Sequence, residues 1–246
     1  MFGRLSHGLR AGPTTSTGAC CRMQSLSPKS LRDILRILAC VLVLKVTVGV
    51  VLAYRDYLPP DFGSDFLQGR AEYFWDGYHW AFYTHIASGP CSLMLGMILL
   101  SNRFRRRFSK WHRRLGRVQV VCVLFLVTPS GLWMAFYAFT GTVACAGFAS
   151  VAVGTAVAIC LGWRAAVRKR FDEHRRWMLR CYLMLCSAVV LRLTSGLFTV
   201  AGIEDEWTYS LAAWSSWLVP LGAFELLRLR RHVISPTHVR PRDAGV

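Results

Sequence analysis

The stretch Trp111-His112-Arg113-Arg114-Leu115-Gly116-Arg117 closes a strongly basic loop and stands at the mouth of a long apolar run. It returns in variant form as Glu173-His174-Arg175-Arg176-Trp177-Met178-Leu179-Arg180, again before an apolar run. Runs of about 20 apolar residues are long enough to cross a bilayer as a helix. We therefore interpret both stretches as loops between membrane helices.

The composition supports a membrane protein. Hydrophobic residues make up 54% of the 246 residues and charged residues only 17%, a balance that favours a bilayer over a globular core. The formal charge of +17 sits in short loops between apolar runs rather than on one polar face. This placement predicts contact with anionic lipids and argues against nucleic acid as a partner.

Six apolar runs predict an all-α, six-transmembrane-helix bundle within residues 31–228. The predicted helices cover about 34–54, 80–100, 118–139, 143–161, 177–200 and 208–227. Pro129-Ser130-Gly131 predicts a kink in the third helix. The basic tails 1–30 and 229–246 lie outside this domain.

The loop charges predict the topology. Residues 102–117 and 163–176 and both tails are rich in Lys and Arg, whereas 55–79 and 202–207 are acidic. With six spans, all the basic segments fall on one side, so both termini are predicted to be cytoplasmic. The protein is accordingly predicted to be an integral, multi-pass membrane protein, and the sequence does not distinguish the plasma membrane from an organelle membrane.

Two further features leave alternatives open. Residues 1–30 are Arg-rich and lack acids, which fits a disordered tail or a cleaved targeting segment, and Cys20-Cys21 is a weak palmitoylation candidate. In the fourth helix, small residues recur every fourth position, a pattern that allows close helix packing and predicts an oligomer contact. These residues are Ser150, Gly154, Ala158 and Gly162.

The His-Arg-Arg repeat suggests an internal duplication of parallel orientation, since helices two and three and helices four and five are each joined by a basic loop. Beyond this, five short motifs in order resemble a family of predicted membrane proteins catalogued as domain of unknown function 2306. They are His85–Pro90, Trp111–Arg117, Gly147–Ala149, His174–Met178 and Leu191–Leu193. The resemblance covers about residues 75–200 and implies a shared four-helix core of helices two to five, without an established activity. The helical layout is also similar, at the level of fold alone, to the di-haem cytochrome b561 architecture.

Three polar residues inside the spans are candidate ligand-binding residues: His85, Arg192 and Lys45. A charged side chain deep in a bilayer costs at least about 2.5–3.5 kcal/mol unless it finds a partner. His85 and Arg192 belong to the same leaflet and are expected to share an outward-facing cavity. The structural alternative is that Arg192 binds carbonyls or pairs with Asp205 or Glu206, and that His85 is a hydrogen-bonded core residue.

His112 and His174 lie at equivalent inner helix ends, so these two, with His85, are candidate axial ligands of a b-type haem. The alternative is that the neighbouring arginines bind lipid headgroups. These arginines are Arg113, Arg114, Arg175 and Arg176. Glu225 is a further intramembrane charge, for which Lys45 is a distant candidate partner.

The sequence contains no G-x-S-x-G, H-E-x-x-H or phosphate-binding Gly-x-x-x-x-Gly-Lys motif, which argues against a hydrolase, metalloprotease or ATPase. Two functions stay open. The first is a membrane redox role with His-ligated haem; the second is a non-enzymatic carrier or binder of an anionic or lipid ligand. A structural assembly subunit is a third alternative, and whether the protein is an enzyme is undecided.

Overall fold

The computed structural model describes residues 28–64, 66–138, 141–203 and 205–234. The predicted tail segment 1–27, with Cys20-Cys21, and the end of the C-terminal tail lie outside the described residues. The chain divides into two compact units, Met1–Leu38 and Ala39–Val246. In the first unit, helix α1 begins at Pro28 and carries an exposed ion pair between Arg36 and Asp33, 3.3 Å apart.

The described part of the chain is helical and contains no strand. Helix α1 ends at Leu52, and a short α2, Ala71–Tyr73, precedes α3, His79–Leu100. The remaining helices are α4 (Asn102–Arg107), α5 (Ser109–Cys122), α6 (Thr128–Phe136), α7 (Thr142–Val167), α8 (Phe171–Leu185), α9 (Ser187–Val200) and α10 (Glu206–Ile234). A π-helical turn, Val123–Val127, joins α5 to α6 without a break.

Among the described residues, six continuous helical segments are long and apolar enough to cross a membrane. They are Asp33–Asp56, Ala71–Leu100, Ser109–Phe136, Thr142–Val167, Phe171–Val200 and Glu206–Arg230. The predicted all-α architecture with six spans is therefore confirmed. The cytoplasmic placement of the termini stays a prediction.

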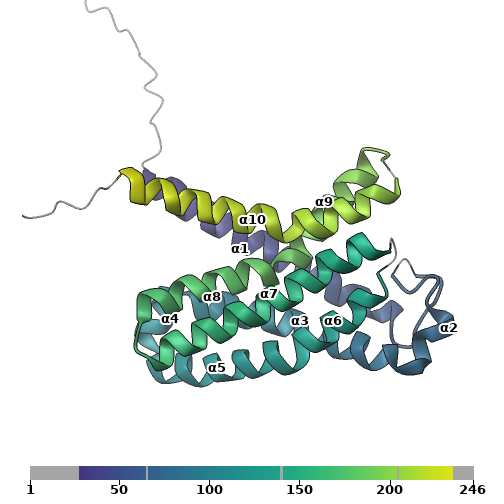
Figure 1. Cartoon of the computed structure of the whole chain (residues 1–246), viewed down its shortest axis with the longest axis horizontal. Helices are drawn as coiled ribbons and strands as arrows, with labels where there is room; N and C mark the ends of the chain where they lie inside the picture. Colours follow the sequence, from purple (N-terminus) through teal and green to yellow (C-terminus); the bar gives the residue numbers. More distant parts are fainter. Residues whose placement is uncertain (1–27, 65, 139–140, 204, 235–246) are drawn as a thin grey trace, which may run out of the picture. The chain divides into compact units, whose positions relative to one another are not determined.

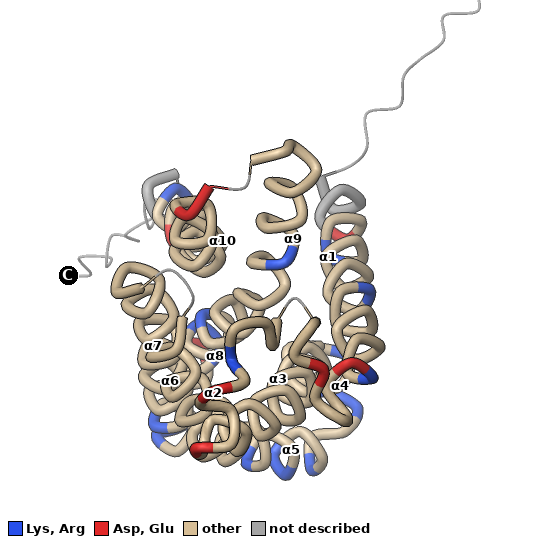
Figure 2. The backbone as a smooth tube through the Cα atoms, turned by 90° about the vertical axis from the view of Figure 1, so that its right-hand side faces the viewer, with Lys and Arg blue, Asp and Glu red and all other residues tan. Residues whose placement is uncertain are grey.

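The core consists of four spans. Helix α3 contacts α6 and α8, and α7 contacts the same two helices, so the four close into a ring that can be followed end-on in Figure 2. Its centre is filled by the buried side chains of Val123, Ile159, Cys181 and Met184. Helix α10 packs on α7, α8 and α9. The ring corresponds to the predicted core of helices two to five.

The two ends of the second unit differ in charge. The loops that hold α4 and the α7–α8 turn lie at one end, whereas α2 and the α9–α10 turn lie at the other (Figure 1). We call these the basic end and the acidic end. In Figure 2, which looks from the acidic end, the backbone at Asp and Glu residues is red near α2 and at the start of α10.

Two predicted loops are helical instead. The segment 102–117 forms α4 and the start of α5, and α8 begins at Phe171 rather than Trp177. His112 and His174 are each the fourth residue of their helix. Helices extend past the apolar runs because long Arg and Lys side chains reach the headgroups from helical backbone. The equal register of the two histidines supports the predicted duplication.

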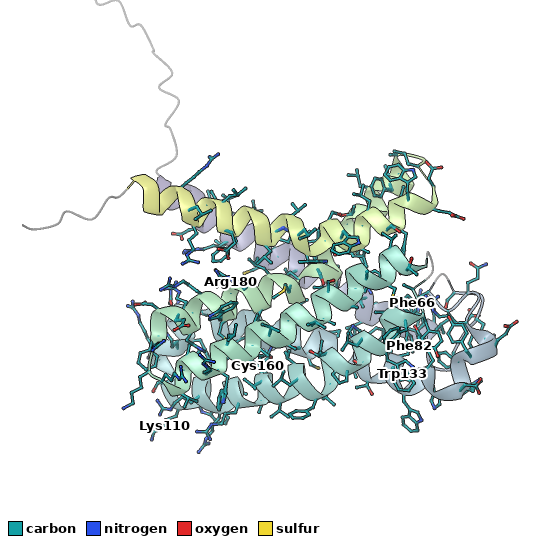
Figure 3. All side chains as sticks on the ribbon, in the orientation of Figure 1. Phe66, Phe82, Lys110, Trp133, Cys160 and Arg180 are labelled. Atoms are coloured by element: carbon teal, nitrogen blue, oxygen red, sulfur yellow. The ribbon has the colours of Figure 1, made fainter. Side chains whose placement is uncertain are left out.

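The acidic-end segment 55–79, predicted as a loop with an interfacial aromatic cluster, folds into a compact cap. Leu67, Phe74, Tyr78 and Phe82 are fully or almost fully buried in it. The rings of Phe66 and Phe82 stack with centroids 5.4 Å apart (Figure 3). Arg70 is buried as well, with its guanidinium carbon 4.6 Å above the Phe66 ring. The aromatic residues therefore build an apolar core of their own, besides any contact with the bilayer interface.

Candidate functional site

His85 is held by the irregular stretch that joins α5 and α6. Pro129 has no amide hydrogen to donate, and the π-helical turn Val123–Val127 comes directly before it. The Ser130 hydroxyl lies 2.5 Å from the Leu126 carbonyl, and His85 Nδ1 lies 3.1 Å from Ser130 Oγ. Since the hydroxyl has one proton and donates it to the carbonyl, Nδ1 donates to Ser130, which leaves Nε2 of a neutral imidazole as an acceptor.

Gly131 allows this close approach. A Cβ at Gly131 would lie only 3.2 Å from Cε1 of His85. Pro129, Ser130 and Gly131 lie in the first turn of α6, so the predicted kink at these residues stays a prediction. The irregular backbone of this span is the π-helical turn Val123–Val127, just before α6. Such turns are frequent at functional sites.

Arg192 lies near His85, as the sequence predicted. Its charge is within electrostatic reach of His85, Tyr54 and Tyr57. Arg192 Nη1 donates to the carbonyl of Ala188 in its own helix, at 3.1 Å, and the side chain remains accessible. Among the ion pairs of the described residues, none involves Arg192. The site therefore combines one uncompensated guanidinium, a neutral imidazole and two tyrosines.

Lys45 is not brought to this site. Val43 and Thr47 are buried on the inward face of α1, whereas Lys45 is exposed. Lys45 is two residues from each of them, and at about 100° per residue this places it on the opposite side of the helix axis. It therefore lies on the outward face of the helix, away from His85 and Arg192.

Glu225 is paired, but not with Lys45. Arg180 Nε donates to Glu225 Oε1 at 2.7 Å, and Arg228 lies 3.5 Å from the other carboxylate oxygen. Arg180 also stacks on Trp177, with its guanidinium carbon 4.4 Å from the ring centroid. Figure 3 shows Arg180 on α8 beneath α10. The sequence reasoning missed this residue because it began the fifth span at Trp177 and so placed Arg180 at the membrane surface.

His112 and His174 are close enough to interact electrostatically. His174 Nδ1 must donate to the Gly162 carbonyl, 2.8 Å away, because a carbonyl only accepts. Nδ1 of His112 is buried and has no partner among the described residues. His85 lies toward the acidic end and is not part of this pair. Among the residues that the structure describes, no three His, Cys, Asp or Glu side chains cluster closely enough to hold a metal ion.

The four predicted lipid-headgroup arginines are exposed at the basic end. They are Arg113, Arg114, Arg175 and Arg176. Lipid binding by these residues stays a prediction, favoured by their position.

The predicted small-residue stripe is occupied within the chain. A Cβ at Gly154 would lie 3.0 Å from Met184 Sδ, and one at Gly162 would lie 2.1 Å from Met178 Cε. Ala158 is buried in the same core. Gly154, Ala158 and Gly162 thus pack α7 against α8 within the chain, and an oligomer contact through the stripe stays a prediction.

Residues 82–228 match a family described as Predicted membrane protein (DUF2306). The match covers more than half of the 246 residues. The chain belongs to this family. The DUF2306 match extends to residue 228, beyond the end expected near residue 200, and so takes in most of α10. No curated protein matches the chain, and no solved structure matches it.

Proposed function

We propose that this DUF2306 protein binds a membrane-soluble anion through Arg192 and His85. The observation that carries the proposal is the uncompensated Arg192. It lies eight residues from the end of α9 at Val200, so roughly 12 Å deep at 1.5 Å per residue. A carbonyl of its own helix is a weak substitute for the charge-assisted, bidentate partner that a guanidinium prefers.

The neighbours of Arg192 favour an amphiphile. A carboxylate or phosphate on Arg192 would have the His85 imidazole and the tyrosines beside it as neutral polar groups, while its alkyl tail stays in the lipid. No second cation lies within the described surroundings of Arg192, since Lys45 points elsewhere. A single guanidinium suits a headgroup with one negative charge, such as a fatty-acid carboxylate, and its fork geometry also matches the oxygens of a phosphate such as that of lysophosphatidate.

Thermal unfolding of the purified protein tests this proposal. Oleate or lysophosphatidate at a hundred times its Kd should stabilise the protein by about 2.7 kcal/mol, whereas neutral monoolein should not. Arg192→Leu should abolish the effect and Arg192→Lys should weaken it. Lys45→Leu is the matched control and should keep it. A full response in Arg192→Leu would refute the proposal.

The haem hypothesis has support of its own. The Nε2 atom of His174 is left available because Nδ1 is bound by Gly162, an arrangement seen in metal-bound histidines. His112 and His174 would be the residues that hold the iron, and Arg105, which is also within electrostatic reach of His112, would neutralise a propionate. Haem bound here would supply one-electron transfer.

Absorbance separates the two candidates. Haem ligation predicts a Soret band in protein expressed with added haem precursor, and His112→Ala or His174→Ala should remove it. A folded wild-type protein without this band contradicts haem binding. The anion proposal does not depend on the outcome.

A further inference from the structure

A line of polar side chains follows the contact between α3 and the span formed by α5 and α6. From the acidic end, His85 meets Ser130, Ser88 meets Cys122 and Ser92 meets Gln119. The atom pairs are His85 Nδ1 and Ser130 Oγ at 3.1 Å, Cys122 Sγ and the Ser88 carbonyl at 3.9 Å, and Gln119 Nε2 with the Ser92 carbonyl at 3.0 Å and Ser92 Oγ at 2.9 Å. We call these six residues the polar seam.

The seam is buried inside the core. Ser88, Ser92, Gln119 and Ser130 are each at most 6% exposed. On α3 the seam residues lie at positions 85, 88 and 92, which share one helix face. A buried polar line of this kind in a hydrocarbon environment is costly unless each group is satisfied.

One seam residue is not satisfied. The Ser92 carbonyl only accepts, so the amide nitrogen of Gln119 must face it, which leaves Oε1 buried without a partner among the described residues. Nδ1 of His112 is the second such atom. Gln119 and His112 lie on one face of α5, about two turns apart.

The helix surface between Gln119 and His112 carries no side chain at Gly116. Gly116 lies on the same face of α5, and a Cβ built there would meet no atom within 4 Å outside its own helix turn. Buried polar atoms without protein partners next to free space are where ordered water binds in proteins. Water between Gln119 and His112 would continue the seam to the basic end, where His174 is within electrostatic reach.

We propose that the polar seam holds a file of water that conducts protons between the acidic and basic ends. A proton accepted by water next to His85 moves on as each water takes one proton and passes another along its hydrogen bond. The serine, cysteine and glutamine groups orient the waters, and His112 relays by accepting at one ring nitrogen while releasing from the other. One proton crosses, and no group is oxidised, reduced or left with a changed charge.

The proposal does not rest on anion binding at Arg192. The seam lies within the ring of four core helices, whereas Arg192 is on α9. The two activities therefore have separate variants. Gln119→Leu and Gly116→Leu, both on α5, should lose proton flux and keep the ligand response of the wild type.

Proton flux is measured with full-length protein in liposomes that contain pyranine, with a potassium gradient and valinomycin to set the potential. Wild type should acidify or alkalinise the lumen faster than empty vesicles. Gln119→Leu should slow the flux by about tenfold or more, a factor that corresponds to about 1.4 kcal/mol of barrier. Gly116→Leu fills the open space while leaving the Ser92–Gln119 bonds in place, and should slow it similarly.

Thr155→Val is the matched control. Thr155 is buried in α7 and its hydroxyl donates to the Val151 carbonyl of its own helix, at 2.6 Å, so its loss should leave the flux unchanged. Size-exclusion elution and melting curves identify variants that are folded. Wild-type flux equal to that of empty vesicles, or unchanged flux in folded Gln119→Leu and Gly116→Leu, would overturn the proposal and leave the seam a helix-packing contact.

Discussion

The ion pair of Arg180 and Glu225 should hold α10 to the core. Its hydrogen bond is 2.7 Å long, and the two side chains are only 18% and 33% exposed. A charge-assisted bond contributes about 1.5–3 kcal/mol, whereas loss of one member of a fully buried pair costs about 3–5 kcal/mol. For this partly buried pair we expect Glu225→Gln to lower the free energy of unfolding by about 2 kcal/mol, because Arg180 and Arg228 then face each other without the carboxylate.

A double-mutant cycle isolates the pair. Glu225→Gln, Arg180→Gln and the double variant are unfolded with SDS in mixed micelles, and the coupling energy should be about 1–2 kcal/mol. The matched control is the cycle on Arg170 and Glu173, which are 3.6 Å apart and 63% and 44% exposed. That surface pair should give less than about 0.5 kcal/mol. Equal coupling energies in the two cycles would refute the claim that partial burial strengthens the pair.

Further variants test the packing, the topology and the charge balance. A Cβ at Gly96 would lie 2.8 Å from a ring carbon of α8, so Gly96→Ala should cost about 1–3 kcal/mol of unfolding free energy. Gly49 has no atom within 4 Å of such a Cβ, and Gly49→Ala should instead be neutral or stabilise by up to about 1 kcal/mol; equal effects would argue against the close contact at Gly96. On a cysteine-free background, Arg105→Cys and Asp205→Cys should react with an impermeant maleimide from opposite sides of the membrane, and labelling from the same side would contradict the predicted topology. Arg192→Gln should leave the ligand-free melting temperature unchanged or raise it, since it removes an unpaired charge; a loss as large as that of the Glu225 variant would indicate a structural role.

The spans and the polarity of their ends could be predicted from the sequence because a bilayer imposes length and charge rules that residues carry individually. Helix starts could not. The apolar run of the fifth span begins only after Arg175 and Arg176, but α8 already begins at Phe171. Helical backbone tolerates charged side chains that reach water, so the helix extends beyond the apolar run. Arg180 therefore lies within the helix as a partly buried partner of Glu225, instead of at the membrane surface as predicted.

Part of the candidate site could likewise be predicted from the sequence, and part could not. That His85 and Arg192 share a leaflet follows from counting residues, and the structure places them within electrostatic reach. Lys45 lies away from the site because Val43 and Thr47 pack inward and so fix the rotation of α1 about its axis. The bond between Gln119 and Ser92 could not be predicted, because it depends on how α3 and α5 are aligned along their axes, and a single sequence does not reveal this alignment.

Two arginines inside the spans show why an unpaired charge is informative here. Arg180 lies nine residues past the start of α8 at Phe171, roughly 13 Å along the helix, and the fold provides it with both a carboxylate and an aromatic ring. Arg192, at comparable distance from its own end of the span, has only a carbonyl of its own helix. Because a charge inside a span is costly without a partner, a fold that neutralises Arg180 and leaves Arg192 exposed within electrostatic reach of a histidine keeps Arg192 available for a partner from outside the chain.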